Sequence, residues 1–165
     1  MAETNNPASS PLPHVKITHT FHAPCQAVFN AWVDPQQLLQ WYAPDGCTIT
    51  FKSIEVREKG SYHSCIYNEQ FGNCWCKGTY MTVQPYTKLV FTMEVTDETG
   101  NDVTPEAAGM APGWPQQTTV TVLFNDNGNN TTTIELYQTV SEELAKKTGA
   151  YPSWLNMFER LQKSM

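Results

Sequence analysis

Residues 21–35 read FHAPCQAVFNAWVDP and decide the local fold through an apolar stripe with a proline near each end. Pro24 suits the first turn of a helix. Asp34 can cap a second helix that carries Pro35 at its first position and runs to Trp41. Spacings of one, three and four separate the stripe residues Val28, Phe29, Trp32 and Val33. The stretch therefore predicts two short helices in series.

Alternation of apolar and polar side chains on both sides of these helices predicts strands with one buried face. Turn residues such as Gly, Pro and Asn separate the alternating stretches. The predicted strands are residues 15–21, 48–57, 61–68, 74–83, 88–95, 119–124 and 133–136. We expect them to form an antiparallel sheet of six to seven strands.

The C-terminal residues 141–165 predict a long helix on that sheet. It opens with Ser-Glu-Glu and carries one apolar stripe. Pro152 cannot donate a backbone hydrogen bond and crowds the carbonyl of Thr148, so a kink or break is expected near Gly149. The stripe consists of Trp154, Phe158, Leu161 and Met165.

The length and charge of the chain exclude several classes of function. Its 165 residues suit one domain, and its net charge of -6, with the basic residues scattered, disfavours nucleic-acid binding. No apolar run is long enough for a membrane span, and no signal for export is visible. We therefore expect a cytoplasmic protein with a mobile, Pro- and Ser-rich tail at residues 1–13 and one domain at residues 14–165.

Five cysteines raise the question of a metal site or a disulfide. The odd number and the absence of an export signal favour reduced thiols. The strand period places His63 with Cys65, and Cys74 with Cys76, on common faces, and a hairpin could bring all four together. A metal site and a disulfide of Cys65 with one of the hairpin partners are the alternatives to ordinary thiols. Ordinary thiols, with no metal and no cofactor, are the favoured interpretation.

Residues 21–35 resemble the opening motif of the START-like (SRPBCC) superfamily, in particular the branch of activator of heat-shock protein 90 ATPase homologues. The resemblance extends over residues 15–165, with two departures: Tyr42 stands where a second Trp is common, and Ser153 where Gly is common. Further matching segments are residues 38–46 (LLQWYAPDG), 78–80 (GTY), 89–92 (LVFT), 118–124 and the helical pattern Trp154-x-x-x-Phe158-x-x-Leu161.

This resemblance implies an α+β helix-grip fold, in which a curved antiparallel sheet wraps around a long C-terminal helix. Between sheet and helix lies a cavity that binds apolar small molecules in many relatives. We therefore expect binding of an apolar or aromatic small molecule, without catalysis, by a monomer or homodimer. The predicted ligand-binding residues are Trp32, Trp41, Tyr62, Ser64, Ile66, Phe91, Met93, Met110, Trp114, Val122, Phe124, Leu136, Trp154, Met157 and Phe158. A fully packed core with no void is the alternative explanation of the same stripes.

Two other functions remain open at this point. One is a cyclase- or hydrolase-like enzyme using the same cavity, with Tyr62, Ser64 or Glu55 as proton donor or acceptor. The other is a co-chaperone that stimulates a heat-shock protein 90 type ATPase, as the family name suggests. Such activators typically join this domain to a separate N-terminal domain, which a tail of about thirteen residues cannot supply.

The segment at residues 98–117 is long for a loop and contains six Gly and Pro residues. Met110 and Trp114 are its large apolar side chains. One interpretation is a lid whose two apolar anchors cap a mouth of the cavity, and the other is a surface loop that joins two strands.

Overall fold

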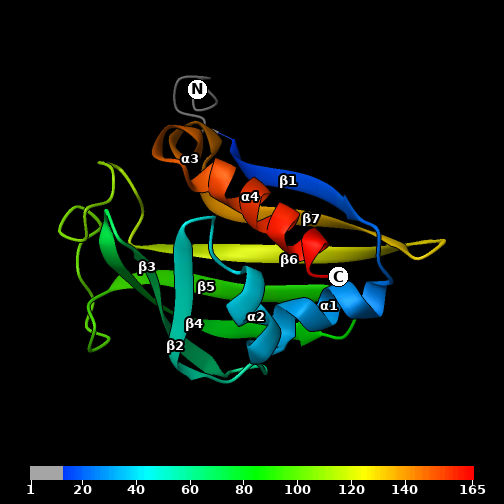
Figure 1. The fold of residues 1–165 in the computed structure, drawn as a ribbon. Helices are drawn as coiled ribbons and strands as arrows, with labels where there is room; N and C mark the ends of the chain where they lie inside the picture. The colour runs from blue at the N-terminus through cyan, green and yellow to red at the C-terminus, as the bar shows by residue number, and fades with distance from the viewer. Residues whose placement is uncertain (1–12) are drawn as a thin grey trace, which may run out of the picture.

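The prolines near the ends of the opening stretch delimit two helices, as the sequence predicts. Helix α1 (Cys25–Val33) follows strand β1 (His14–Phe21), and helix α2 (Pro35–Trp41) follows α1 directly. The Asp34 carboxylate caps α2 by accepting a hydrogen bond of 2.9 Å from the backbone N–H of Gln36. The computed structural model describes residues 13–165 (Figure 1), so the predicted tail lies outside the described residues apart from Pro13.

Seven strands within the described residues form one antiparallel sheet in the order β1-β7-β6-β5-β4-β3-β2. The chain runs as a meander from β2 to β7, and β1 pairs with β7 at the far edge. The six later strands are β2 (Cys47–Ile54), β3 (Ser61–Asn68), β4 (Gly72–Gln84), β5 (Lys88–Thr96), β6 (Gln117–Gly128) and β7 (Thr131–Ser141). The predicted sheet of six to seven strands is confirmed.

The bounds of several strands differ from the prediction. Strand β2 ends at Ile54, because residues 57–60 form a turn in which the Gly60 N–H donates to the Arg57 carbonyl. Strands β6 and β7 extend beyond their alternating segments, since polar residues continue the backbone ladder to the hairpin tip. At its other end β7 continues to Ser141, where it pairs with β1. Backbone pairing therefore reaches further than the apolar pattern that predicts it.

The predicted break in the C-terminal helix is present and separates helix α3 (Glu142–Thr148) from helix α4 (Ala150–Lys163). Gly149 adopts a left-handed conformation with φ of 89°, which glycine tolerates without steric cost. Pro152 then lies in the first turn of α4, where its missing N–H breaks no helical hydrogen bond.

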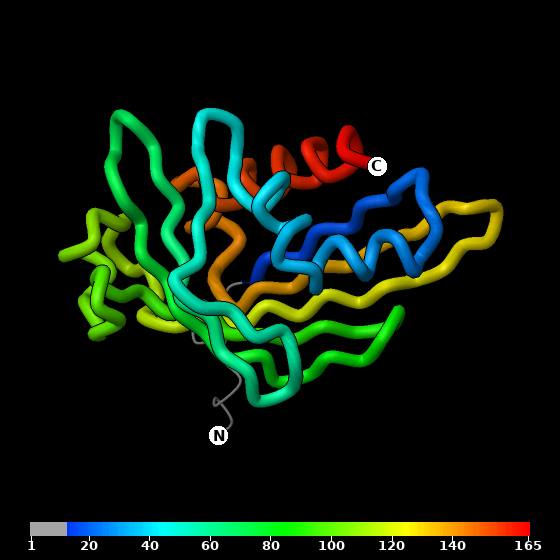
Figure 2. The backbone as a smooth tube through the Cα atoms, turned by 60° about the horizontal axis from the view of Figure 1, so that its bottom comes forward, coloured from blue at the N-terminus to red at the C-terminus, as the bar shows by residue number. Residues whose placement is uncertain are grey.

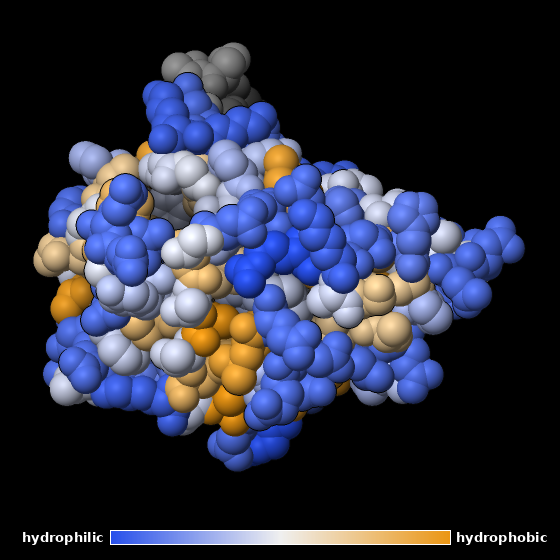
Figure 3. All heavy atoms as spheres, viewed as in Figure 1, coloured by the Kyte–Doolittle hydropathy of each residue, from blue (hydrophilic) through white to orange (hydrophobic). Residues whose placement is uncertain are grey.

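Helices α1, α2 and α4 cover one face of the curved sheet (Figures 1 and 2). The core at this interface is aromatic, with ring centroids 4.8 Å apart for Trp32 and Trp41 and 6.2 Å apart for Trp32 and Phe158. An apolar patch stands out on the molecular surface in the region of α2 and β2 (Figure 3). Leu39 of α2 is 44% exposed. No helix in residues 13–165 is long and apolar enough to cross a membrane.

Candidate functional site

A groove of about 900 Å³ opens at one end of the interface between sheet and helices. Three segments supply most of its lining: the β3–β4 hairpin near its tip, the loop between β5 and β6, and the junction of α3 and α4. Cys47, at the start of β2, also lines it. Figures 1 and 2 show that these segments gather at the same end of the molecule although they are distant in sequence. The groove therefore exists only through the tertiary fold.

Apolar side chains from the strands and the loop line much of this groove. Ile66 projects from β3, and Met110 and Trp114 come from the loop. Phe71, at the hairpin tip, is 84% exposed and lines the same hollow. On the opposite side, the break at Gly149 contributes only small side chains, so the groove stays open there. This lining is suited to binding the apolar or aromatic surface of another molecule.

The loop that carries Met110 and Trp114 is held by its own hydrogen bonds. The Asp97 carboxylate accepts hydrogen bonds from Thr99 and Asn101, which lower the pKa of Asp97. The side chain of Gln116 donates to the Val95 carbonyl at 2.9 Å, where the loop enters β6. Both predicted lid anchors thus line the groove, and the opening motion of a lid stays a prediction.

From the groove, the inner face of the sheet continues towards a small enclosed cavity. Along β3, Ile66 lies at the groove, Ser64 in the middle and Tyr62 at the cavity, a path of about 13 Å at the usual rise of a strand. Ser64 pairs with Cys76 of β4, so the middle of the path carries two small side chains. Burial raises the pKa of the Cys76 thiol to about 11, which keeps it neutral at neutral pH.

The enclosed cavity has a volume of only about 10 Å³, the scale of one water molecule. Six aromatic and two leucine side chains close it, and the phenols of Tyr42 and Tyr62 have pKa values raised well above their usual value by burial. The lining residues are Trp32, Leu38, Tyr42, Phe51, Tyr62, Tyr80, Leu89 and Phe91. Side chains thus fill most of the space in which the sequence predicts a ligand, and the open volume lies at the groove.

The predicted ligand-binding residues fall into three groups. Those at the groove are Ile66, Met110 and Trp114. Those at the enclosed cavity are Trp32, Tyr62 and Phe91. The remaining ones line neither hollow and belong to the buried core or the inner face of the sheet: Trp41, Ser64, Met93, Val122, Phe124, Leu136, Trp154, Met157 and Phe158.

A buried network of hydrogen bonds between the sheet and α4 was not predicted from the sequence. Gln138 on β7 accepts a hydrogen bond of 2.9 Å from the indole N–H of Trp154 and donates one of 3.1 Å to the hydroxyl of Thr118. Gln138 continues the alternation of Ile134 and Leu136 along β7, and this alternation is the one feature of the sequence that indicates an inward-facing Gln138. Phe71 and Tyr42 were missed as well, because exposure of the first and burial of the second depend on distant segments.

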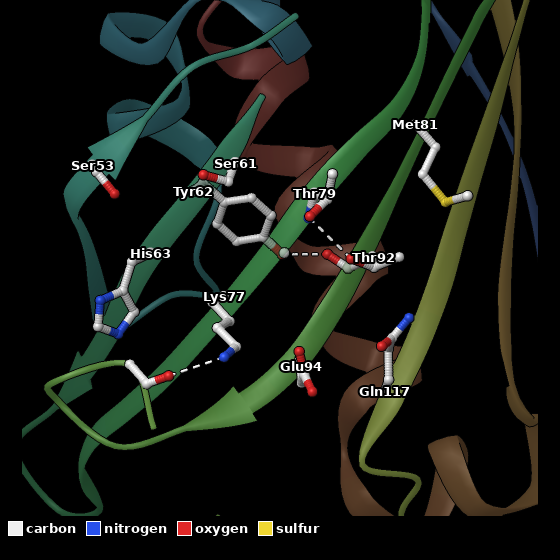
Figure 4. Close-up of a pocket in the computed structure, with 12 residues that line it drawn as sticks. Ser53, Ser61, Tyr62, His63, Lys77, Thr79, Met81, Thr92, Glu94 and Gln117 are labelled. Carbon is white, nitrogen blue, oxygen red and sulfur yellow. Dashed lines mark hydrogen bonds between the residues drawn. The ribbon is translucent and has the colours of Figure 1, made fainter. Parts of the chain in front are cut away.

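The Tyr62 ring lies across β4 at Gly78, the residue with which Tyr62 is directly paired, and its hydroxyl points towards Thr92 of β5 (Figure 4). A Cβ atom at Gly78 would clash with the Thr92 carbonyl and lie 2.6 Å from the Tyr62 ring, so only glycine fits beside the ring at this position. The phenol then donates a hydrogen bond of 2.7 Å to the Thr92 carbonyl. A polar pocket of about 480 Å³ borders Tyr62 and is also lined by Lys77. Lys77 forms an ion pair of 3.1 Å with Asp102.

The residues considered for acid–base chemistry are engaged in other contacts or exposed to solvent. The Tyr62 hydroxyl donates to a backbone carbonyl, and burial raises its pKa, which disfavours its ionised form. The Ser64 hydroxyl donates to the Cys76 carbonyl at 3.4 Å. Glu55 is exposed and pairs with Arg57 at 3.4 Å. These contacts bring no acid and base together at the groove.

The strand register excludes the alternative in which His63, Cys65, Cys74 and Cys76 come together. Cys65 pairs with Trp75, whereas Cys74 and Cys76 pair with Ile66 and Ser64, so the two halves of the set point to opposite faces of the sheet. All five cysteines lie in the described part of the chain and are free thiols. No cluster of metal-ligating side chains occurs among residues 13–165.

A curved antiparallel sheet, two short helices at one end and a C-terminal helix across the concave face define the helix-grip class. The chain belongs to the family described as Activator of Hsp90 ATPase homolog 1-like protein, whose model matches residues 22–165. The family resemblance noted in the sequence is thereby confirmed. No curated protein matches the sequence.

Solved structures from several bacteria have the same fold. A protein from Chromobacterium violaceum has a TM-score of 0.74 at 15% identity, covering 93% of this chain and 97% of that chain. A protein from Staphylococcus epidermidis has a TM-score of 0.75 at 18% identity, with coverages of 94% and 90%. The AHSA1 protein from Silicibacter pomeroyi reaches 0.70 at 16% identity, with coverages of 92% and 96%. At these identities the likeness establishes the fold alone.

Proposed function

We propose that the protein binds an apolar or aromatic small molecule at the groove, with the inner face of β3 and β4 as the continuation of the site. The observation that carries this proposal is the groove of about 900 Å³ lined by Ile66, Met110 and Trp114. A drug-sized molecule fits a hollow of this volume. The binding site is thus displaced from the middle of the interface towards its open end.

The exposure of Phe71 supports the proposal independently. A phenylalanine that is 84% exposed gains free energy when a ligand covers it, because its apolar surface leaves water. Two small side chains, Ser64 and Cys76, lie between the groove and the enclosed cavity, where larger ones would block the path along the sheet. A flat or elongated molecule suits that path.

Binding is favoured over the other two functions by particular contacts. The proton donors and acceptors that an enzyme of the cyclase or hydrolase kind would use are Tyr62, Ser64 and Glu55, and they face a backbone carbonyl, a second carbonyl and solvent. For stimulation of a chaperone ATPase, the family description is the sole support.

The test is a titration of the protein with 2-isopropylnaphthalene, followed by calorimetry and by tryptophan fluorescence. We expect saturable binding to one site. Phe71→Ser removes apolar surface from the groove and should weaken binding about ten- to hundredfold, since burial of a phenylalanine side chain is worth about 1.5–3 kcal/mol. The matched control is Leu39→Ser, which removes an exposed apolar side chain that does not line the groove.

Absence of saturable binding to the wild-type protein would refute the proposal. Equal losses in the two variants would also contradict it, because they would indicate non-specific adsorption to exposed apolar surface. Thermal unfolding of both variants checks that neither substitution changes the fold.

A further inference from the structure

Two side chains that line the enclosed cavity each carry a buried polar atom without the hydrogen bond that such an atom normally makes. These atoms are the indole nitrogen Nε1 of Trp32 and the hydroxyl oxygen of Tyr42, for which no partner exists among the described residues. Both side chains line the same cavity, and Trp32 is only 2% exposed. A buried donor without a partner costs about 1–3 kcal/mol, so each such group requires an explanation.

The other buried indoles show what Trp32 lacks. Trp41 donates from Nε1 to the Ala31 carbonyl at 3.0 Å, and Trp154 donates from Nε1 to the Gln138 side chain at 2.9 Å. These three rings pack against one another, with the Trp32 centroid 4.8 Å from that of Trp41 and 6.2 Å from that of Trp154. The fold therefore supplies acceptors for two of the three indoles in one cluster and none, from residues 13–165, for the third.

The size and charge of the cavity indicate what would complete these bonds. A volume of about 10 Å³ holds one oxygen atom and not a whole ring. Each of the eight lining side chains is uncharged: five are hydrocarbon or indole, and three are phenols. A carboxylate would lose its hydration there without gaining a cation, at a cost of several kcal/mol. The partner is an uncharged oxygen.

We propose that Trp32 and Tyr42 form the polar end of the ligand site and recognise a neutral acceptor oxygen, such as a ketone or ether, on an otherwise apolar molecule. This inference rests on the proposed function, because the molecule reaches the cavity from the groove along Ser64 and Cys76. The Tyr42 ring lines the cavity and packs against the ring of Trp154, with centroids 5.9 Å apart, so it must shift as the molecule enters.

Three nearly isosteric probes separate oxygen recognition from apolar binding: 2-acetylnaphthalene, 2-isopropylnaphthalene and 2-naphthoate. We expect the wild-type protein to bind the ketone most tightly, the hydrocarbon less tightly and the carboxylate weakest. Tyr42→Phe removes only the hydroxyl and should reduce the preference for ketone over hydrocarbon about three- to tenfold. The control Tyr67→Phe removes an exposed phenol that does not line the cavity and should leave the preference unchanged.

The indole N–H signals in a nitrogen–proton correlation spectrum give a second measurement on the full-length protein. The Trp32 signal, assigned by its loss in Trp32→Phe, should move downfield with the ketone and not with the hydrocarbon. The Trp41 signal should stay in place, since its N–H is already bonded to a carbonyl.

Each other outcome has a definite meaning. Binding of the hydrocarbon without any preference for the ketone would overturn the inference and leave the proposed function intact. A Trp32 signal that is downfield without a probe and unmoved by the ketone would also overturn it, and would indicate a permanent internal water. If the wild-type protein binds neither probe, the proposed function fails and the inference with it.

Discussion

The two ends of the interface between sheet and helices are built from the same inner face and differ in what covers it. At the closed end, α1, α2 and α4 place Trp32, Trp41 and Phe158 against the sheet, and all three side chains are almost fully buried. At the open end, a loop, a hairpin tip and a helix junction cover the strands, and a groove of about 900 Å³ remains. Regular helices bring large side chains at fixed spacing, whereas Gly- and Pro-rich segments do not.

This difference predicts that truncation of a large side chain mainly affects stability at the closed end and mainly affects ligand exchange at the open end, in spite of similar side chains. Three substitutions test this difference between the two ends, and they are given in order of decreasing expected effect.

Phe158→Ala, at the closed end, should have the largest effect. Phe158 is fully buried between the ring of Phe21, 5.9 Å away, and that of Trp154, 6.1 Å away, so its truncation leaves a cavity among rigid neighbours. We expect the free energy of unfolding to fall by about 3–5 kcal/mol. Urea denaturation measures it. A loss below about 1 kcal/mol would mean that the closed end repacks and is not the stability core.

Trp114→Ala, at the open end, tests the same type of truncation in a partly exposed setting. We expect a loss of about 1 kcal/mol in the free energy of unfolding, because Trp114 is only partly buried against the core. If the loop acts as a lid, dissociation of 2-isopropylnaphthalene should become roughly tenfold faster, as measured by stopped-flow fluorescence. A large loss of stability with unaltered dissociation would instead assign Trp114 to the core and refute the lid.

The smallest expected effect is a pH dependence at the closed end. His19 lies with its ring centroid 4.6 Å from that of Phe21, and burial lowers its pKa, an effect that Glu159 opposes and His22 reinforces. The folded state therefore binds fewer protons than the unfolded state near the usual pKa of about 6.5. This contribution to stability is complete above that pH and is lost as the pH falls through the lower, folded-state pKa.

The measurement compares the wild-type protein with His19→Gln by urea denaturation between pH 8 and pH 5. The wild-type protein should lose more stability than the variant on acidification, by a fraction of a kcal/mol. Parallel pH profiles would show that the interface at the closed end does not penalise a charge on His19.

Local patterns in the sequence predicted the fold well because they depend on neighbours along the chain. The prolines at positions 24 and 35, the alternation in each strand and the pair of Gly149 and Pro152 act within a few residues. The helices, the sheet and the broken C-terminal helix are confirmed on that basis. The sequence could not decide between ordinary thiols and the metal or disulfide alternatives, because strand register, which the sequence leaves open, places Cys65 opposite Trp75.

The sequence by itself determined which side chains face inward, since the strand period of two and the helical stripe assign each residue to one face. Tertiary structure decided which inward side chains pack and which are left at a hollow. Trp32, Trp41 and Trp154 share one aromatic cluster, yet only the fold determines that Ala31 and Gln138 offer acceptors to two of them. The groove likewise depends on the meeting of Ile66, Trp114 and Gly149. The physical reason is that a cavity and a hydrogen bond depend on distances between segments, which no local pattern contains.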